Sequence, residues 1–275
     1  MSSKLKVLSP RQTPREHKAP LLEIKDLVRV FRTGGTYLKA LDGISLEVQP
    51  GEMLCVLGPS GCGKTTLLKV LAGFLKPSGG HVFLRGKPIA GPGPDRCVVF
   101  QEDALFPWLT VAENIDFGLK ALKISRRRRR ELLDRSLSLI GLSAFRNYLP
   151  QEISGGMKQR VALARVLILE PEILLMDEPF AALDAQTREE MQLLLLRLWE
   201  MLSQTVVFVT HDVREAVTLA DRVVVMEKHS GRLKDIVDID LERPRSPDDQ
   251  RFLSRCARLN DLLRNDSIAC PLKYA

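Results

Sequence analysis

The sequence predicts an α/β fold in which a parallel sheet forms the core, with a β-rich part before it and a helical insertion within it. Short, continuously apolar runs alternate with helical patterns, as strands buried on both faces do. These runs are 53–57, 173–176, 206–209 and 222–226. A glycine-rich loop follows the first run and precedes a helical pattern, which is typical of phosphate-binding α/β proteins.

The β-rich part comes first along the chain. Residues 21–31 and 41–48 alternate apolar and polar side chains, which predicts two half-buried strands. Residues 32–37, with two glycines, predict the turn between them. Short β-rich stretches at 82–84 and 98–100 follow, so we expect an antiparallel β subdomain beside the parallel sheet.

Helical periodicity dominates several later segments. They are 64–75, 111–142, 155–169, 188–202, 213–220 and 248–263. We therefore expect a disordered basic leader over 1–20, one domain over 21–240 with a helical subdomain at about 105–170, and a short C-terminal helical extension over 241–275.

The net charge of +7 invites a nucleic-acid interpretation, but the excess is local. Residues 1–20 carry +4 and residues 120–135 carry +6, whereas 21–119 and 136–240 together carry −5. The run Arg126–Arg130 predicts a solvated helical face, or one that meets anionic lipid headgroups. The sequence shows neither a secretory signal nor an apolar stretch of spanning length, and its five scattered cysteines predict free thiols.

The glycine-rich loop matches the pattern GxxxxGK[ST] at every fixed position. Its residues are Gly58, Pro59, Ser60, Gly61, Cys62, Gly63, Lys64 and Thr65, with Thr66 next in the helix. Glycines let successive backbone N–H groups surround phosphate oxygens, and the helix N-terminus adds a positive dipole end. Lys64 supplies charge for the β- and γ-phosphates, and Thr65 supplies a hydroxyl for Mg²⁺, so a P-loop NTPase core is expected.

Two acids end the buried run 173–176. Asp177 is the candidate Mg²⁺ ligand, because a carboxylate at a strand tip beside the phosphate loop can reach the metal. Glu178 leaves the strand direction and is the candidate general base for the attacking water. Considered alone, the pair is also compatible with an ordinary solvated strand end.

Further segments resemble one family. Ile153–Arg160, with the sequence ISGGMKQR, is similar to the signature segment of ABC-transporter ATPase subunits, and 182–184 resembles the D-loop of that family. His211 resembles the switch histidine, and Gln101 the Q-loop glutamine. Phe31 is similar in place to the aromatic residue that stacks on adenine, although Tyr37 is near and an aromatic in such a strand is often core. The resemblance covers roughly residues 21–240, and Met157 departs from the common signature, which has Gln.

The resemblance implies a site shared between two chains. Ser154, Gly155 and Gly156 would meet the γ-phosphate held by a partner subunit, with Asp184 beside the nucleotide. His211 would hydrogen-bond the γ-phosphate, and Gln101 would contact Mg²⁺ and the water. Lys64, Gln101, Glu178 and His211 form the implied catalytic set, with ATP and Mg²⁺ as ligands and a homodimer, or a pair of ATPase subunits, as the working unit.

The segments 91–96 and 106–114 are similar to the nitrate, sulfonate and taurine importer ATPases. This implies separate membrane permease subunits, an indirectly coupled periplasmic or lipid-anchored solute-binding protein, a peripheral position on the cytoplasmic face of the inner membrane, and no nucleic-acid partner. The cluster Leu105–Leu109 is a candidate docking surface, or else part of the helical core. An ABC exporter subunit and a soluble ABC ATPase acting on nucleic acid remain alternatives.

Overall fold

Six strands form the central sheet of the computed structural model, which describes residues 19–100, 104–122 and 124–264. From one edge to the other they are β10 (Leu233–Asp238), β9 (Arg222–Met226), β3 (Met53–Leu57), β8 (Thr205–Thr210), β7 (Ile173–Asp177) and β6 (Arg96–Val99). All neighbours from β9 to β6 are parallel, and β10 pairs antiparallel with β9. The predicted α/β fold with a parallel core is therefore confirmed.

The central strands of this sheet are apolar because both of their faces are covered. Every residue of β3 and β8 is buried, as the continuous apolar runs predict. β10 has no counterpart among the predicted strands. Its six residues include Lys234, Asp235 and Asp238 and are mostly part-exposed, so this edge strand lacks the apolar signal of the others.

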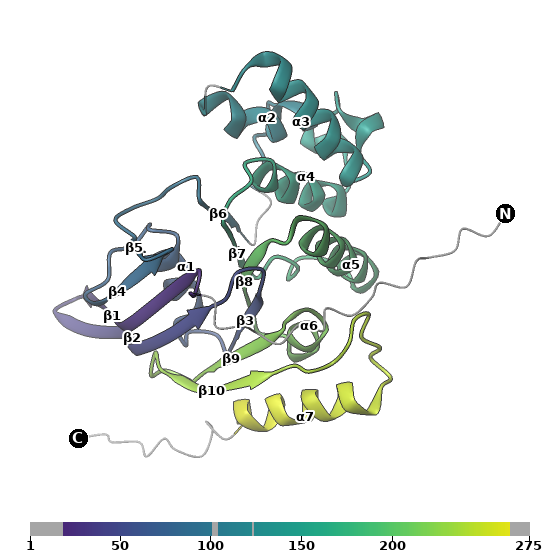
Figure 1. Ribbon diagram of the computed structural model, residues 1–275. Helices are drawn as coiled ribbons and strands as arrows, with labels where there is room; N and C mark the ends of the chain where they lie inside the picture. Colours follow the sequence, from purple (N-terminus) through teal and green to yellow (C-terminus); the bar gives the residue numbers. More distant parts are fainter. Residues whose placement is uncertain (1–18, 101–103, 123, 265–275) are drawn as a thin grey trace, which may run out of the picture.

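A second, antiparallel sheet lies beside the first (Figure 1). Its strands are ordered β2 (Thr36–Val48), β1 (Leu22–Thr33), β4 (Gly79–Leu84) and β5 (Lys87–Pro88). The turn predicted over 32–37 is wrong in extent, since β1 and β2 pair as far as Thr33 and Thr36. Gly34 and Gly35, with φ of 56° and 86°, make a two-residue hairpin turn that keeps the flanking residues in the ladder.

Helices cover the two faces of the central sheet. On one face, α1 (Lys64–Leu71) packs into a core shared with the second sheet. On the other face, α5 (Ala185–Leu202), α6 (Val213–Leu219) and α7 (Gln250–Arg264) share a core with the strands. Helix α1 ends four residues before the predicted boundary, close to Gly73, whose φ is 79°.

The segment between β6 and β7 carries three helices, drawn at the top of Figure 1. They are α2 (Val111–Ala121), α3 (Arg126–Leu139) and α4 (Gly155–Leu167), with short 3₁₀ turns at Ser143–Phe145 and Pro150–Glu152. They enclose an apolar core of their own. The periodicity predicts one helical segment over 111–142, but the structure has two helices there, α2 and α3. The side chain of Ser125 accepts a hydrogen bond from the N–H of Arg128 and caps the start of the second helix.

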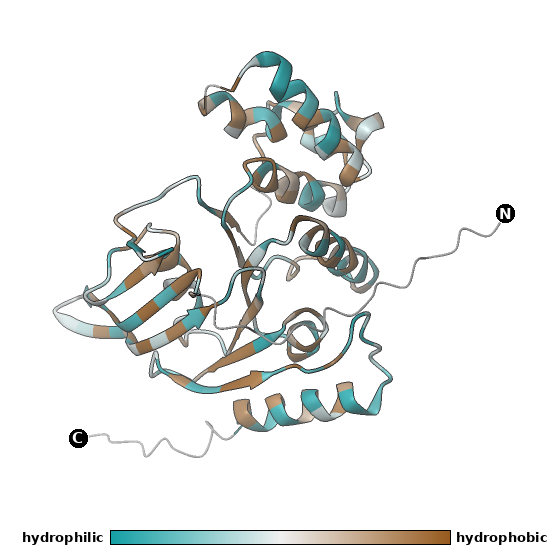
Figure 2. Cartoon of the chain, in the orientation of Figure 1, coloured by the Kyte–Doolittle hydropathy of each residue, from teal (hydrophilic) through white to brown (hydrophobic). Residues whose placement is uncertain are grey.

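The arginine run lies in the first turns of α3, which is coloured hydrophilic in Figure 2. Arg127 and Arg128 are exposed and approach Glu131 on the same helix, at 3.3 and 3.5 Å. Arg129 is mostly covered instead and lies 3.4 Å from Asp116 of α2. The run is thus mainly a solvated face, with one arginine joining two helices.

The described part of the chain contains no helix long and apolar enough to cross a bilayer. The four described cysteines are free thiols, which agrees with the absence of CxxC spacing, and Cys270 lies outside the described residues. Burial is the largest cause that raises the pKa of the Cys55 and Cys97 thiols, the latter to about 11. These two thiols are therefore protonated and unreactive at neutral pH.

Candidate active site

The glycine-rich loop joins the end of β3 to the start of α1. Gly61 and Gly63 have φ of 80° and 109°, a region that residues with a Cβ rarely adopt. A Cβ on Gly63 would lie 2.4 Å from the carbonyl oxygen of Ala40, and one on Gly58 would lie 2.7 Å from Sγ of Cys62. The loop closes in this form only because these positions are glycine.

Lys64 folds back over this loop. Its side chain is 5% exposed, and Nζ donates hydrogen bonds to the carbonyl oxygens of Gly58, at 2.7 Å, and Pro59, at 3.0 Å. The same Nζ lies 3.8 Å from Oε1 of Glu178. A buried ammonium group over a glycine loop, next to a helix N-terminus, fits the negative charge of a nucleotide's phosphate chain.

Thr65 and Asp177 meet across the sheet edge, although 112 positions separate them. Oγ1 of Thr65 donates to Oδ1 of Asp177 at 3.1 Å. Burial raises the pKa of Asp177, the Thr65 hydrogen bond opposes this, and the charge of Glu178 raises it further. A hydroxyl and a carboxylate are the oxygen ligands that Mg²⁺ prefers, and Mg²⁺ commonly takes only one or two of them besides water and phosphate. The pair therefore fits that metal.

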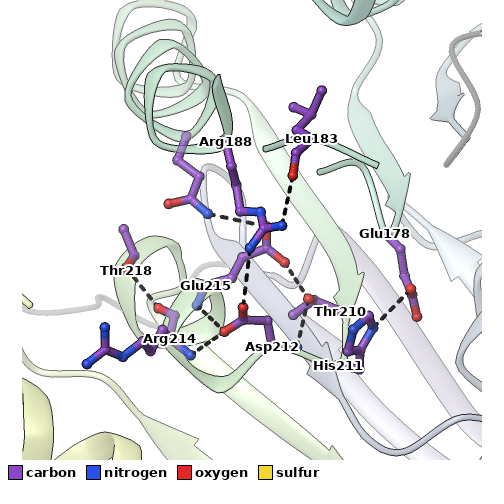
Figure 3. A network of polar contacts seen from close by, with 10 residues as sticks. Glu178, Leu183, Arg188, Thr210, His211, Asp212, Arg214, Glu215 and Thr218 are labelled. Carbon is purple, nitrogen blue, oxygen red and sulfur yellow. Dashed lines mark hydrogen bonds and ion pairs between the residues drawn. The ribbon is translucent and has the colours of Figure 1, made fainter. Parts of the chain in front are cut away.

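Glu178 and His211 stand next to each other at the carboxyl ends of β7 and β8 (Figure 3). Oε2 of Glu178 lies 3.0 Å from Nδ1 of His211. Glu178 has a φ of 45°, and its N–H donates to the carbonyl of Val209 at 3.0 Å, so the chain turns out of the strand there. This arrangement holds a carboxylate and an imidazole together on the side where Lys64 and Thr65 lie.

A set of polar residues behind His211 was not among the candidates from sequence. Thr210 donates to the carboxylate of Glu215, and Arg188 donates to the carbonyl of Leu183 at 2.9 Å and lies 4.0 Å from Asp212 (Figure 3). Burial raises the pKa of Glu215, and the charge of Asp212 adds to this against the Thr210 hydrogen bond. Single residues on three elements carry no local pattern, so only the tertiary structure reveals the set.

The signature segment lies at the start of α4. Ser154 is the N-cap residue and accepts a hydrogen bond from the N–H of Met157 at 3.3 Å. A Cβ on Gly156 would lie 2.6 Å from the methyl of Thr187, and Thr187 in turn donates to Asp184, the N-cap of α5. The structure therefore brings the signature segment beside Asp184, whose pKa these Thr187 hydrogen bonds lower.

Phe31 lies near the end of β1 and is partly exposed. The guanidinium of Arg29 lies over its ring, 4.6 Å from the centroid, so the ring is partnered by a cation within its own strand. Gln101 lies outside the described residues. The structure brings Lys64, Thr65, Asp177 and Glu178 together. Phe31 contacts Arg29 instead, and the position of Gln101 stays a prediction.

A strand, a glycine loop, a helix and an acid pair at the end of β7, with β8 between β3 and β7 in the sheet, together define a P-loop NTPase. Residues 41–181 match the family model described as ABC transporter. An uncharacterized ABC transporter ATP-binding protein of Methanocaldococcus jannaschii is 49% identical over 92% of this chain and 94% of its own length. The chain therefore belongs to the ABC transporter family and is an ABC-type ATPase that binds ATP.

Other relatives carry named transport roles. The taurine import ATP-binding protein of Pelagibacter ubique is 48% identical over 76% of this chain and 79% of its own length. The nitrate import ATP-binding protein of Synechococcus elongatus is 47% identical over 77% of this chain and 78% of its own length. These are proteins that the chain resembles in sequence.

Solved structures agree with the fold. The structure of cbiO1 from Clostridium perfringens, part of the ABC transporter complex cbiONQ, is 31% identical with a TM-score of 0.73 and covers 81% of this chain and 90% of that one. A dimeric ATP-binding cassette bound to ADP and phosphate is 31% identical with a TM-score of 0.70, covering 80% of this chain and all of the other.

Proposed function

We propose that this chain is the ATP-hydrolysing subunit of an ABC importer for a small anion or sulfonate such as nitrate or taurine. The observation that carries the ATPase chemistry is the convergence of Lys64, Thr65, Asp177, Glu178 and His211 at one edge of the sheet. Similarity over about three quarters of the chain to taurine and nitrate import proteins supports the direction and class of transport.

In the proposed reaction Lys64 and the loop N–H groups would hold the β- and γ-phosphates, while Thr65, Asp177 and Gln101 would hold Mg²⁺. When bound, Mg²⁺ neutralises charge that develops on the phosphate oxygens. Glu178 would orient the attacking water and accept its proton as the water oxygen bonds to the γ-phosphorus, the bond between that phosphorus and the β–γ bridging oxygen breaks, and ADP leaves. His211 would steady Glu178 and hydrogen-bond the γ-phosphate. Phe31 supports the adenine ring. Positioning and charge therefore supply most of the catalysis.

Two copies complete the site in this proposal. Ser154, Gly155 and Gly156 open α4 with N–H groups able to hold an anion, and Asp184 lies beside them. These groups would face the γ-phosphate bound to a second copy or a paired ATPase subunit. The dimeric form of a similar cassette supports this arrangement. Closure of the pair on ATP would drive the permease, and release after hydrolysis would reopen it.

The membrane permease subunits would dock on the helical part. Trp108 is 71% exposed, and its ring lies 5.7 Å from that of Phe106, which contacts Phe117 at 4.6 Å. Exposed aromatic clusters of this kind are typical of protein-binding surfaces. The chain would thus act as a peripheral protein on the cytoplasmic face of the inner membrane, coupled only indirectly to a solute-binding protein and not to nucleic acid.

Trapping the ATP-bound dimer tests both halves of the proposal. Glu178→Gln should abolish turnover, retain ATP binding, and elute as a dimer with ATP and Mg²⁺ in size-exclusion chromatography with light scattering. Adding Ser154→Arg should return that variant to a monomer, because the bulky cation blocks the shared phosphate site. Glu47→Gln, at an exposed acid on β2, is the matched control. Hydrolysis at the normal rate in Glu178→Gln, or a dimer that survives Ser154→Arg, would overturn the corresponding half.

The transport role has its own test. Affinity purification of the tagged chain from detergent-extracted membranes should recover multi-spanning permease subunits, and the reconstituted complex should accumulate the solute inward. Recovery of ribosomal RNA or DNA instead would favour a soluble ABC ATPase. Solute movement away from the binding-protein side would favour an exporter subunit.

A further inference from the structure

We propose that Arg188, Asp212 and Glu215 are positioning residues that hold His211 against Glu178 and tie its place to the backbone of residues 182–184. The inference rests on the proposed function, because it concerns the same histidine and base. It adds a connection, through helix α5, between the D-loop-like segment and the residue that steadies the base (Figure 3).

The ring of His211 has little packing of its own, since its side chain is 57% exposed. Its direction therefore depends on the contact with Glu178 and on the backbone of the residues on either side. Both of those neighbours are held by hydrogen bonds. The hydroxyl of Thr210 accepts from the N–H of Asp212 at 3.1 Å and donates to Glu215, which is 6% exposed.

Asp212, on the other side of His211, is held by hydrogen bonds to the start of α6. Its Oδ1 accepts hydrogen bonds from the N–H groups of Arg214, at 2.7 Å, and Glu215, at 3.2 Å, which fixes it as the N-cap of α6. The hydrogen bonds of Thr210 and Asp212, the residues on either side of His211, thereby tie both neighbours of the histidine to the first turn of α6.

Arg188 links this assembly to residues 182–184. One guanidinium nitrogen donates to the carbonyl oxygen of Leu183 at 2.9 Å, and another lies 4.0 Å from Oδ2 of Asp212. One turn further along α5, the amide of Gln192 donates to Oε1 of Glu215 at 3.4 Å. Because a guanidinium is planar and its donors keep a fixed spacing, displacement of Leu183 would be passed to Asp212, next to His211.

The NMR chemical shifts of the His211 ring test the proposal, because they depend on the surroundings of the ring. The chain has only four histidines, so the His211 ring signals can be assigned by their loss in His211→Ala. Arg188→Ala and Glu215→Gln should shift the His211 signals and leave those of His81 and His229 in place. Arg197→Ala, an exposed arginine on the same helix, is the control and should shift none. Unchanged His211 signals in folded Arg188→Ala and Glu215→Gln would overturn the proposal.

Kinetics separate positioning from general stability. Arg188→Ala should lower kcat about tenfold or more, as loss of an outer support does, with the KM for ATP changed less than about twofold. Introduced into His211→Ala, the same change should have almost no further effect. An equal fold-loss in both backgrounds would contradict action through His211. Absence of turnover in the unaltered protein would instead refute the proposed function, and the NMR comparison would still test the positioning.

Discussion

Nδ1 of His211 lies 3.0 Å from Oε2 of Glu178, so two residues 33 positions apart form one hydrogen-bonded pair. β7 and β8 are adjacent and parallel, and Glu178 and His211 each follow one of these strands directly. Parallel strands deliver the residues that follow them to the same edge of the sheet. The pair therefore depends on strand order, and the contact with His211 sets the direction of the Glu178 carboxylate.

His211→Ala should lower the ATPase kcat by about a hundredfold or more, since a group that orients a general base contributes to that step. Steady-state ATP hydrolysis by the purified chain measures this. His81→Ala, which removes an exposed histidine from β4, should leave the rate unchanged. A rate within twofold of normal in His211→Ala would contradict the role of the pair.

Gly63→Ala should lower the unfolding free energy by at least about 1 kcal/mol and weaken ATP binding, because the backbone has a φ of 109° and the new Cβ would meet the Ala40 carbonyl. Urea denaturation and fluorescent-nucleotide titration measure the two effects. Gly91→Ala is the control, as a Cβ there enters open space without a positive φ. Equal behaviour of the two variants would refute the steric argument.

Asp177→Asn should raise the Mg²⁺ concentration for half-maximal hydrolysis by about tenfold, since it replaces a charged ligand oxygen with a neutral one. Titrating Mg²⁺ at saturating ATP gives this value. Asp261→Asn, at an exposed acid of α7, should leave the Mg²⁺ curve in place. An unaltered curve for Asp177→Asn would remove Asp177 from the metal site.

Glu215→Gln should change how stability depends on pH. Burial raises the pKa of Glu215 in the folded state, so its favourable contribution is complete below the unfolded-state pKa and is lost as pH rises through the folded-state pKa. The variant lacks this titration, so its unfolding free energy relative to the unaltered protein should increase between acidic and neutral pH. Chemical denaturation across that range measures the difference. Parallel curves for Glu215→Gln and the unaltered protein would contradict the raised pKa.

Reversing three exposed arginines of α3, by Arg127→Glu, Arg128→Glu and Arg130→Glu, should reduce binding to vesicles that contain anionic lipid. Each arginine near such a surface contributes about 1 kcal/mol. Arg129 is left unchanged because it approaches Asp116. Vesicle co-sedimentation measures the bound fraction, and vesicles of zwitterionic lipid give the baseline. If the variant and the unaltered protein bind anionic vesicles equally, the arginine face does not bind lipid and is only a solvated surface.

The elements that could be predicted are those with a local signal. β3, β7, β8 and β9 coincide with apolar runs, since strands buried on both faces contain little else. Element ends were less accurate. α5 begins three residues before the predicted start because Asp184 caps it through Thr187, and this capping contact outweighs the apolar periodicity on which the prediction relied.

β10 and the residues behind His211 could not be predicted for a different reason. β10 is held by pairing with β9 and has no continuous apolar run. Arg188, Thr210 and Glu215 come from α5, β8 and α6, and their types and spacing match no motif. Their roles depend on contacts between elements, so no short segment of the sequence could predict them.

The sequence alone determined which chemical groups this protein has for handling phosphate: the glycines and Lys64 of one loop, and two acids after an apolar strand. Those signals are local because a phosphate loop and a strand tip are each built from consecutive residues. Only the tertiary structure decided which groups meet. It set Thr65 against Asp177 across 112 positions and Glu178 against His211, because β7 pairs beside β8 and all the parallel strands end at one edge of the sheet.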